Sequence, residues 1–169
     1  GGAPFVGSEI FSLSARALGF IISAPALGYM IGNFLSGRYS ATIGINRMIF
    51  AGCIISSLAP ITALTTLAIG SSNPLAFFAP MVLVGLGNGL TIPNATAGAL
   101  SVRPHLAGTA SGLNGALLIG IGAAVSAFAG TLLTIETGAT PLLILMLSCG
   151  LLGFTTIWLV VLRERRMKG

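Results

Sequence analysis

Long apolar runs separated by short polar segments dominate this chain. Five runs are long enough to cross a bilayer, at about residues 17–36, 48–69, 75–100, 109–134 and 141–162. About 20 consecutive apolar residues in a helix span the hydrocarbon core of a membrane, so each run predicts a transmembrane α-helix. The expected fold is an all-α, polytopic transmembrane helical bundle that forms a single membrane domain over residues 1–169.

The composition supports a protein that lives in lipid. Of the 169 residues, 54% are hydrophobic and 7% are charged, and the mean hydropathy is +1.00. A soluble domain carries about 25% charged residues, so this chain has too few to cover itself in water. A pI of about 10.3 can indicate nucleic-acid binding, but here the cations lie in short loops and a tail between apolar runs. The expected partner is therefore the lipid bilayer, and no nucleic acid.

The cations also predict the orientation. Because successive spans alternate direction, the polar segments 37–47 and 101–108 and the C-terminal tail fall on one side. That side holds every lysine and arginine except Arg16: Arg38, Arg47, Arg103, Arg163, Arg165, Arg166 and Lys168. Positive residues mark the cytoplasmic side of membrane proteins. We expect a multi-pass protein of the cell inner (plasma) membrane with a cytoplasmic C-terminus.

Small residues recur every four positions in two of the runs. The first run carries Gly28 and Gly32, and the fourth carries Gly112 and Gly120, each within a longer series of glycine, alanine and serine. Small residues at this spacing allow helices to approach closely. The pattern predicts that the fourth span is tightly sandwiched, although chance in a Gly/Ala-rich sequence gives the same spacing.

The inventory of reactive side chains argues against an enzyme. No charged residue lies at the centre of any span, the chain has no aspartate, and its one histidine, His105, falls in a loop. No metal-ligand cluster can be built from these residues, so no metal and no cofactor are expected. Cys53 and Cys149 lie inside apolar runs and are expected to be small buried residues.

Neutral polar residues in the third run are the main candidates for a site. At about 100° per residue, Asn88, Thr91 and Asn94 spread over roughly 120° of the helix surface and make one polar face. Pro93 should kink or loosen the helix beside them, because proline cannot donate to the carbonyl one turn earlier. This face either lines a substrate cleft with a hinge at Pro93, or its amides hydrogen-bond to neighbouring helices.

Other polar and aromatic side chains leave the same two alternatives open. Asn33 in the first run and Asn114 in the fourth either line the cleft or join helices. Tyr29 and Phe34 either offer aromatic surface to an apolar ligand or face lipid.

Two motifs carry a family resemblance. The spacing Gly37-Arg38, Gly44 and Arg47 between two spans resembles the second-half copy of the cytoplasmic loop motif of the major facilitator superfamily. The first-half form has an acid before its arginine, which this copy lacks. Residues 87–100 and 103–113, from Gly87-Asn88-Gly89-Leu90 to Ser111-Gly112-Leu113, closely resemble the tenth and eleventh helices of its bicyclomycin and chloramphenicol resistance (Bcr/CflA) group of multidrug exporters.

The resemblance implies a C-terminal six-helix half of a twelve-helix transporter. Residues 1–7 would end a truncated first helix of that half, and the five full spans would follow it. The implied activity is export of a small drug-like substrate by alternating access in exchange for protons. The proton-carrying acids would lie in the missing N-terminal half, the partner of this chain. Arg38 and Arg47 would act in a cytoplasmic gate loop, or would only set the topology.

Three other functions remain open at this stage. The same fold serves importers or facilitators of neutral metabolites, and the lack of buried charge suits these substrates equally well. A complete short membrane protein could act as an assembly or channel-like subunit. An intramembrane enzyme is the least favoured reading, for want of catalytic groups.

Overall fold

The computed structural model describes residues 2–70 and 73–168. The helical segments, in order, are α1 (Ala3–Phe5), the π-helix η1 (Val6–Ile10), α2 (Ala15–Ile22), α3 (Ala24–Ile43), α4 (Ile45–Ala68), α5 (Pro74–Phe78), α6 (Met81–Ser101), the 3-10 helix η2 (Pro104–Leu106), α7 (Ala107–Leu132) and α8 (Thr140–Lys168). Residues 71 and 72 of the predicted turn at 70–74, and the side chain of Lys168, lie outside the described residues.

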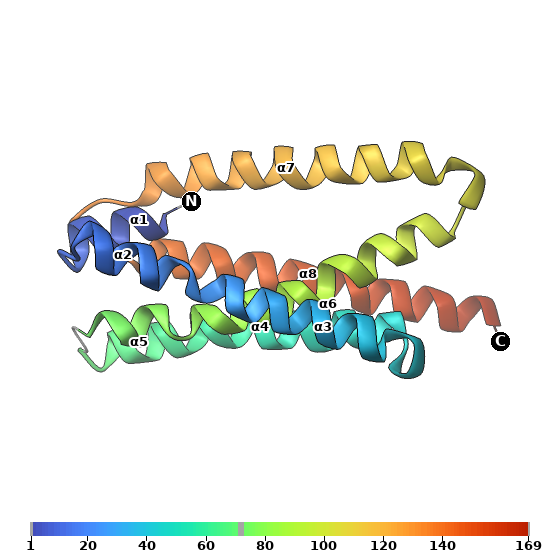
Figure 1. Ribbon diagram of the computed structural model, residues 1–169, viewed down its shortest axis with the longest axis horizontal. Helices are drawn as coiled ribbons and strands as arrows, with labels where there is room; N and C mark the ends of the chain where they lie inside the picture. The colour runs from blue at the N-terminus through green and yellow to red at the C-terminus, as the bar shows by residue number, and fades with distance from the viewer. Residues whose placement is uncertain (1, 71–72, 169) are drawn as a thin grey trace.

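Among the residues that the structure describes, five helical segments are long and apolar enough to cross a membrane. They are Ala15–Ile43, Ile45–Ala68, Pro74–Ser101, Pro104–Leu132 and Thr140–Met167. They lie roughly side by side in one elongated bundle (Figure 1). The expected all-α, polytopic bundle is therefore confirmed.

The first span is broken into two helices at Ser23, which the apolar pattern did not reveal. The Ser14 side chain caps the start of α2 by accepting from the Ala17 N–H at 3.3 Å. Pro25 lies in the first turn of α3 and has no N–H to continue the bonding of α2. The Ser23 hydroxyl donates to the Phe20 carbonyl at 2.6 Å where α2 ends.

The segment 37–47 was predicted to be a loop and is helical instead. α3 continues to Ile43 and α4 begins at Ile45. Only Gly44 interrupts them, with φ of 95°, a conformation that glycine adopts without steric penalty. A helix can continue through polar residues such as Arg38, because its backbone hydrogen bonds do not depend on apolar side chains. Arg38 and Arg47 thus lie on helix ends.

α6 is the central helix of the bundle, clamped between α3 and α4 by glycines. A Cβ at Gly28 or Gly32 of α3 would collide with backbone carbonyl oxygens of α6. A Cβ at Gly89 of α6 would lie 2.6 Å from the backbone carbonyl oxygen of Tyr29. On another face of α6, a Cβ at Gly52 of α4 would lie 2.6 Å from the oxygen of Gly87. Such backbone approach is possible only without side chains.

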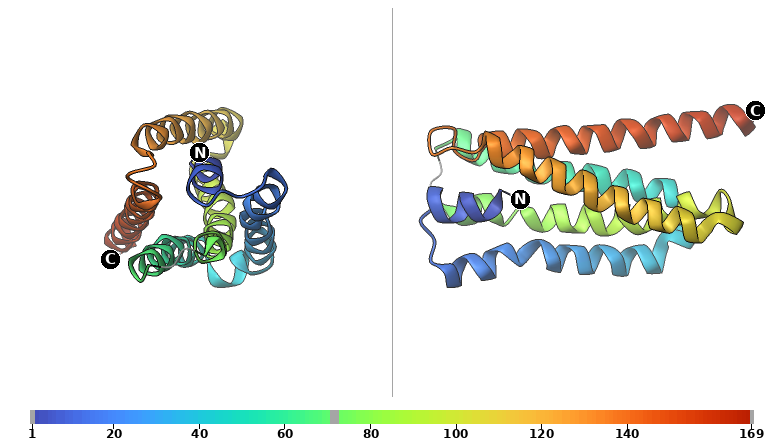
Figure 2. Two further views of the ribbon diagram at one scale, coloured as in Figure 1. Left: turned by 90° about the vertical axis from the view of Figure 1, so that its left-hand side faces the viewer. Right: turned by 90° about the horizontal axis from the view of Figure 1, so that it is seen from above.

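α7 is held much more loosely. A Cβ at Gly112 or Gly120 would meet no atom within 4 Å, and Ile119 is 73% exposed. Figure 2 shows α7 standing apart from the other long helices when the bundle is viewed along its axis. The expected sandwich of the fourth span is therefore absent among the described residues, and the tightly packed helix is α6. Gly28 and Gly32 do pack closely, as their spacing predicted.

The two ends of the bundle differ in character. The α3–α4 junction, the α6–α7 connection and the end of α8 lie together (Figure 1); we call this the basic end. It carries the exposed side chains of Arg38, Arg47, Arg103, Arg163, Arg165 and Arg166. The opposite end holds an apolar core that includes Val6, Phe77, Phe78 and Leu143. The helical residues 3–10 contribute Val6, which is fully buried there.

Candidate functional site

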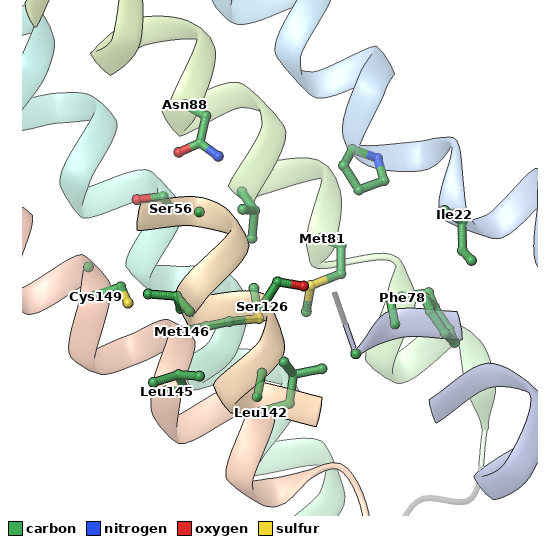
Figure 3. Close-up of a pocket in the computed structure, with 18 of the residues that line it drawn as sticks. Ile22, Ser56, Phe78, Met81, Asn88, Ser126, Leu142, Leu145, Met146 and Cys149 are labelled. Carbon is green, nitrogen blue, oxygen red and sulfur yellow. The ribbon is translucent and has the colours of Figure 1, made fainter. Parts of the chain in front are cut away.

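A cavity of about 520 Å³ lies between α7 and the rest of the bundle (Figure 3). Its lining comes from the N-terminal segment and α2 through α8: Gly2, Ala3, Ile21, Ile22, Pro25, Cys53, Ser56, Phe77, Phe78, Met81, Val84, Asn88, Thr91, Gly122, Val125, Ser126, Ala129, Leu142, Leu145, Met146, Cys149, Gly150 and Gly153. None of these described residues carries a charge. The volume falls within the roughly 300–1,000 Å³ of pockets for small molecules.

Helical periodicity explains how each helix contributes. Met81, Val84, Asn88 and Thr91 recur at intervals of three or four along α6, which places them on one face. Cys149 of α8 and Ser126 of α7 belong to similar series on their own helices. Small residues on α7 and α8, such as Gly122 and Gly153, leave the space between these faces unfilled.

The cavity has an apolar end and a neutral polar end. Phe77, Phe78 and Met81 lie toward the opposite end of the bundle, whereas Asn88 and Thr91 lie about 10 Å and about 15 Å beyond Met81 along α6, at 1.5 Å per residue. Ser56 of α4 joins the polar group. In Figure 3, Asn88 and Ser56 lie toward one side of the view and Ile22 and Phe78 toward the other. A ligand would therefore meet different chemistry at its two ends.

Asn88 is exposed in this cavity, and no hydrogen bond joins its side chain to another described residue. The other asparagines of the long helices are all engaged. Asn33 donates to the backbone carbonyl of Tyr29 at 2.9 Å, and Asn46 donates to the Glu164 carboxylate at 2.8 Å. Asn94 donates to the Ser36 hydroxyl at 2.7 Å, and Asn114 donates to the Thr96 hydroxyl at 3.1 Å. Among the asparagines of the long helices, Asn88 is therefore the one whose amide is not used within the described residues.

Asn94 lies outside the cavity and joins two helices. It is 2% exposed, and its amide donates to the Ser36 hydroxyl of α3 and to the Leu90 carbonyl, both at 2.7 Å. Thr91 does line the cavity. Pro93 lies within α6, which continues to Ser101, and the part of α6 beyond it rises toward α7 in Figure 1.

Tyr29 and Asn114 are not among the residues that line the cavity. Tyr29 is 40% exposed on α3, and its backbone lies against Gly89 of α6. Asn114 links α7 to α6 through Thr96. The structure thus brings together only Asn88 and Thr91 of the predicted cleft residues.

Several lining residues were not predicted from the sequence. Cys149 was expected to be buried, yet it is an exposed free cysteine facing the cavity; Cys53 is buried as expected and also lines it. Met81, Ser56 and Ser126 were overlooked as well. The spacing of Met81 and Val84 relative to Asn88 is the signal that could have found the α6 members.

Arg38 and Arg47 lie far from this chemistry, at the basic end. Both are exposed, and neither has a described hydrogen bond or ion pair. No group of three or more histidine, cysteine, aspartate or glutamate side chains suited to a metal ion occurs in the described part of the chain.

Comparison with known proteins gives one family. The sequence model of the Major Facilitator Superfamily matches residues 3–169. The chain is also 26% identical over 153 residues to the "Uncharacterized MFS-type transporter YdgK" of Bacillus subtilis (strain 168). That alignment covers 90% of this chain and 37% of the relative, so the chain spans little more than a third of the relative's length. No solved structure matches.

Proposed function

The chain belongs to the Major Facilitator Superfamily, a family of membrane transporters rather than enzymes, and on that premise we propose that it forms part of a multidrug exporter of the Bcr/CflA kind. The cargo is a small, largely apolar molecule held in the cavity between α7 and the rest of the bundle. Export proceeds by alternating access and is driven by protons moving inward.

Asn88 is the observation that carries this proposal. It is the helix asparagine without a described partner, and it opens onto the cavity. Ligand pockets combine a mostly apolar lining with a few polar groups that orient the ligand. Asn88 can both donate and accept, and Thr91 and Ser56 supply further hydroxyls beside it.

The lining favours an uncharged cargo. A charged molecule in a low-dielectric site needs an opposite charge, and the described residues around the cavity supply none. Phe77, Phe78 and the thioethers of Met81 and Met146 offer polarizable surface for rings and alkyl groups. Neutral hydrophobic compounds therefore fit better than ions.

The proton carrier is assigned to a part of the protein outside this chain. Proton-coupled carriers use ionisable groups at membrane depth. The three acids of this chain, Glu9, Glu136 and Glu164, lie in η1, in the turn before α8 and near the end of α8. An N-terminal half would complete the transporter, in agreement with the 37% coverage of the relative. By the positive-inside rule, the basic end faces the cytoplasm of the cell that carries it.

The test is a drug-resistance and efflux assay on the full-length protein. Replacing Asn88 by alanine removes one hydrogen bond to the cargo, worth about two- to tenfold in affinity, and should change the drug profile without lowering the protein level. Asn33→Ala is the matched control, since Asn33 bonds only its own helix. Unchanged resistance in Asn88→Ala contradicts the binding role. Sensitisation of cells by the unmodified protein contradicts export and favours an importer.

A further inference from the structure

A single hydrogen bond fixes the end of α8 against the start of α4. The Asn46 amide, in the first turn of α4, donates to the Glu164 carboxylate at 2.8 Å. Glu164 is partly buried at this contact. Because the two residues are 118 positions apart, the bond defines where two distant segments meet at the basic end.

Arginines flank both sides of that contact. Arg47 follows Asn46 on α4, and Arg163 and Arg165 precede and follow Glu164 on α8. At about 100° per residue, Arg163 and Arg165 project on either side of the helix face that meets α4. One of them therefore lies on the same side of the contact as Arg47.

Positive charge is in excess around these guanidinium groups. Arg47, Arg163 and Arg165 are all exposed, and none has a described hydrogen bond or ion pair. Glu164 is the one acidic residue on the described segments of the basic end, so a single negative charge stands against Arg47, Arg163, Arg165 and the other arginines there. The other arginines of that end, including Arg38 and Arg103, add to the positive field.

The depth of the cluster matches the lipid headgroups. The exposed apolar side chains of α8 continue through Trp158, 51% exposed, and Leu162, 39% exposed, and the arginines begin at Arg163. Tryptophan prefers the boundary between hydrocarbon and headgroups. In a bilayer, this order along α8 would bring the guanidinium groups of Arg163 and Arg165 to the level of the lipid phosphates.

We propose that the α4–α8 junction binds the phosphate of an anionic phospholipid, with Arg47 and one or both of Arg163 and Arg165 as its ligands. Guanidinium groups bind phosphate through paired, charge-assisted hydrogen bonds. Basic clusters directly beyond the end of a membrane helix attract anionic lipids. The occupant is a phospholipid rather than a soluble anion, because the neighbouring face of α8 is apolar and exposed.

Trp158 is a built-in reporter for this site. It is the single tryptophan of the chain and lies five residues, or about 7.5 Å along α8, before Arg163. The experiment uses the full-length protein with Trp158 as its only tryptophan, in phosphatidylcholine vesicles. Brominated phosphatidylglycerol or brominated phosphatidylcholine is then added at equal mole fraction, and quenching of Trp158 is compared.

The expected result is stronger quenching by the brominated anionic lipid. The preference should fall about fivefold for each ligating arginine lost, that is, in Arg47→Gln and in at least one of Arg163→Gln and Arg165→Gln. Arg16→Gln, which removes an exposed cation near the other end of the bundle, should leave it unchanged. Lysine at the same positions should restore only part of the preference, since lysine lacks the bidentate fork.

A measurement on the unmodified protein covers the case of variants that do not insert. Raising the salt concentration should weaken the preference, because exposed charges are screened. Equal quenching by both lipids at low salt overturns the proposal. A preference that survives in the triple glutamine variant overturns it too.

Discussion

The amide of Asn94 on α6 donates to the hydroxyl of Ser36 on α3 at 2.7 Å, and both side chains are buried, at 2% and 4% exposure. This bond sits between two helices that glycines already hold in close contact. The polar residues of α6 therefore have two different environments. Asn94 joins α6 to α3, while Asn88, six positions earlier, opens onto the cavity.

The bond between Asn94 and Ser36 should contribute to stability and not to selectivity. Asn94→Ala and Ser36→Ala should each destabilise the protein, with a coupling of about 0.6–1.7 kcal/mol in a double-mutant cycle, as for other hydrogen bonds within membranes. Thermal unfolding in detergent measures the coupling. The drug profile of whichever variants still insert should stay unchanged, and a shifted profile would place Asn94 in the binding site after all.

A second prediction concerns the glycines at the contacts of α6 with α3 and α4. Gly85→Ala should sharply reduce the folded protein in the membrane, because the new Cβ collides with the Pro25 carbonyl of α3. The obstacle is backbone, so relief requires the helices to separate, and overpacking of this kind costs about 1–3 kcal/mol or more.

Gly37→Ala is the matched control for Gly85→Ala. Gly37 also lies in α3, but a Cβ there meets nothing within 4 Å. Its membrane level, measured by fluorescence-detected size exclusion, should equal that of the unmodified protein. Equal loss in both variants would contradict the collision at Gly85 as its cause, since alanine favours a helix more than glycine does.

A negative charge introduced into the cavity should slow the transport of neutral drugs. Ser126 lines the cavity from α7 and has no described hydrogen-bond partner. Ser126→Asp should lower the transport rate of neutral drugs at least tenfold, because a carboxylate with no partner nearby is poorly tolerated in an apolar site. Ser126→Ala, which keeps the space and removes only a hydroxyl, should change the rate little. Initial rates are compared at matched protein levels, and an unaffected rate in Ser126→Asp would contradict a cargo path through the cavity.

The length of the apolar runs was enough to predict five spans and an all-α membrane bundle. Bilayer thickness fixes the length of such runs, so local sequence carries the information. The break at Ser23 and the helical continuation to Ile43 escaped, because both depend on backbone hydrogen bonding rather than on hydropathy.

Packing was harder to predict than span positions. Both glycine series satisfied the same spacing rule, yet Gly28 meets α6 while Gly112 meets nothing described. A stripe of small residues permits a contact but does not name the partner. Likewise, the sequence could not separate Asn88 from Asn94, because their difference lies in which helix each one faces.

Cavity accessibility of Cys149 tests the central claim most directly. Cys149 is exposed and lines the cavity, whereas the only other thiol of the chain, Cys53, is buried. A membrane-permeant maleimide should label Cys149 in the full-length protein freed of other cysteines, and a transported drug should slow that labelling in proportion to its occupancy. Asn88→Ala should raise the drug concentration needed for protection by about two- to tenfold. Labelling that is indifferent to every transported drug would contradict a cargo site in this cavity.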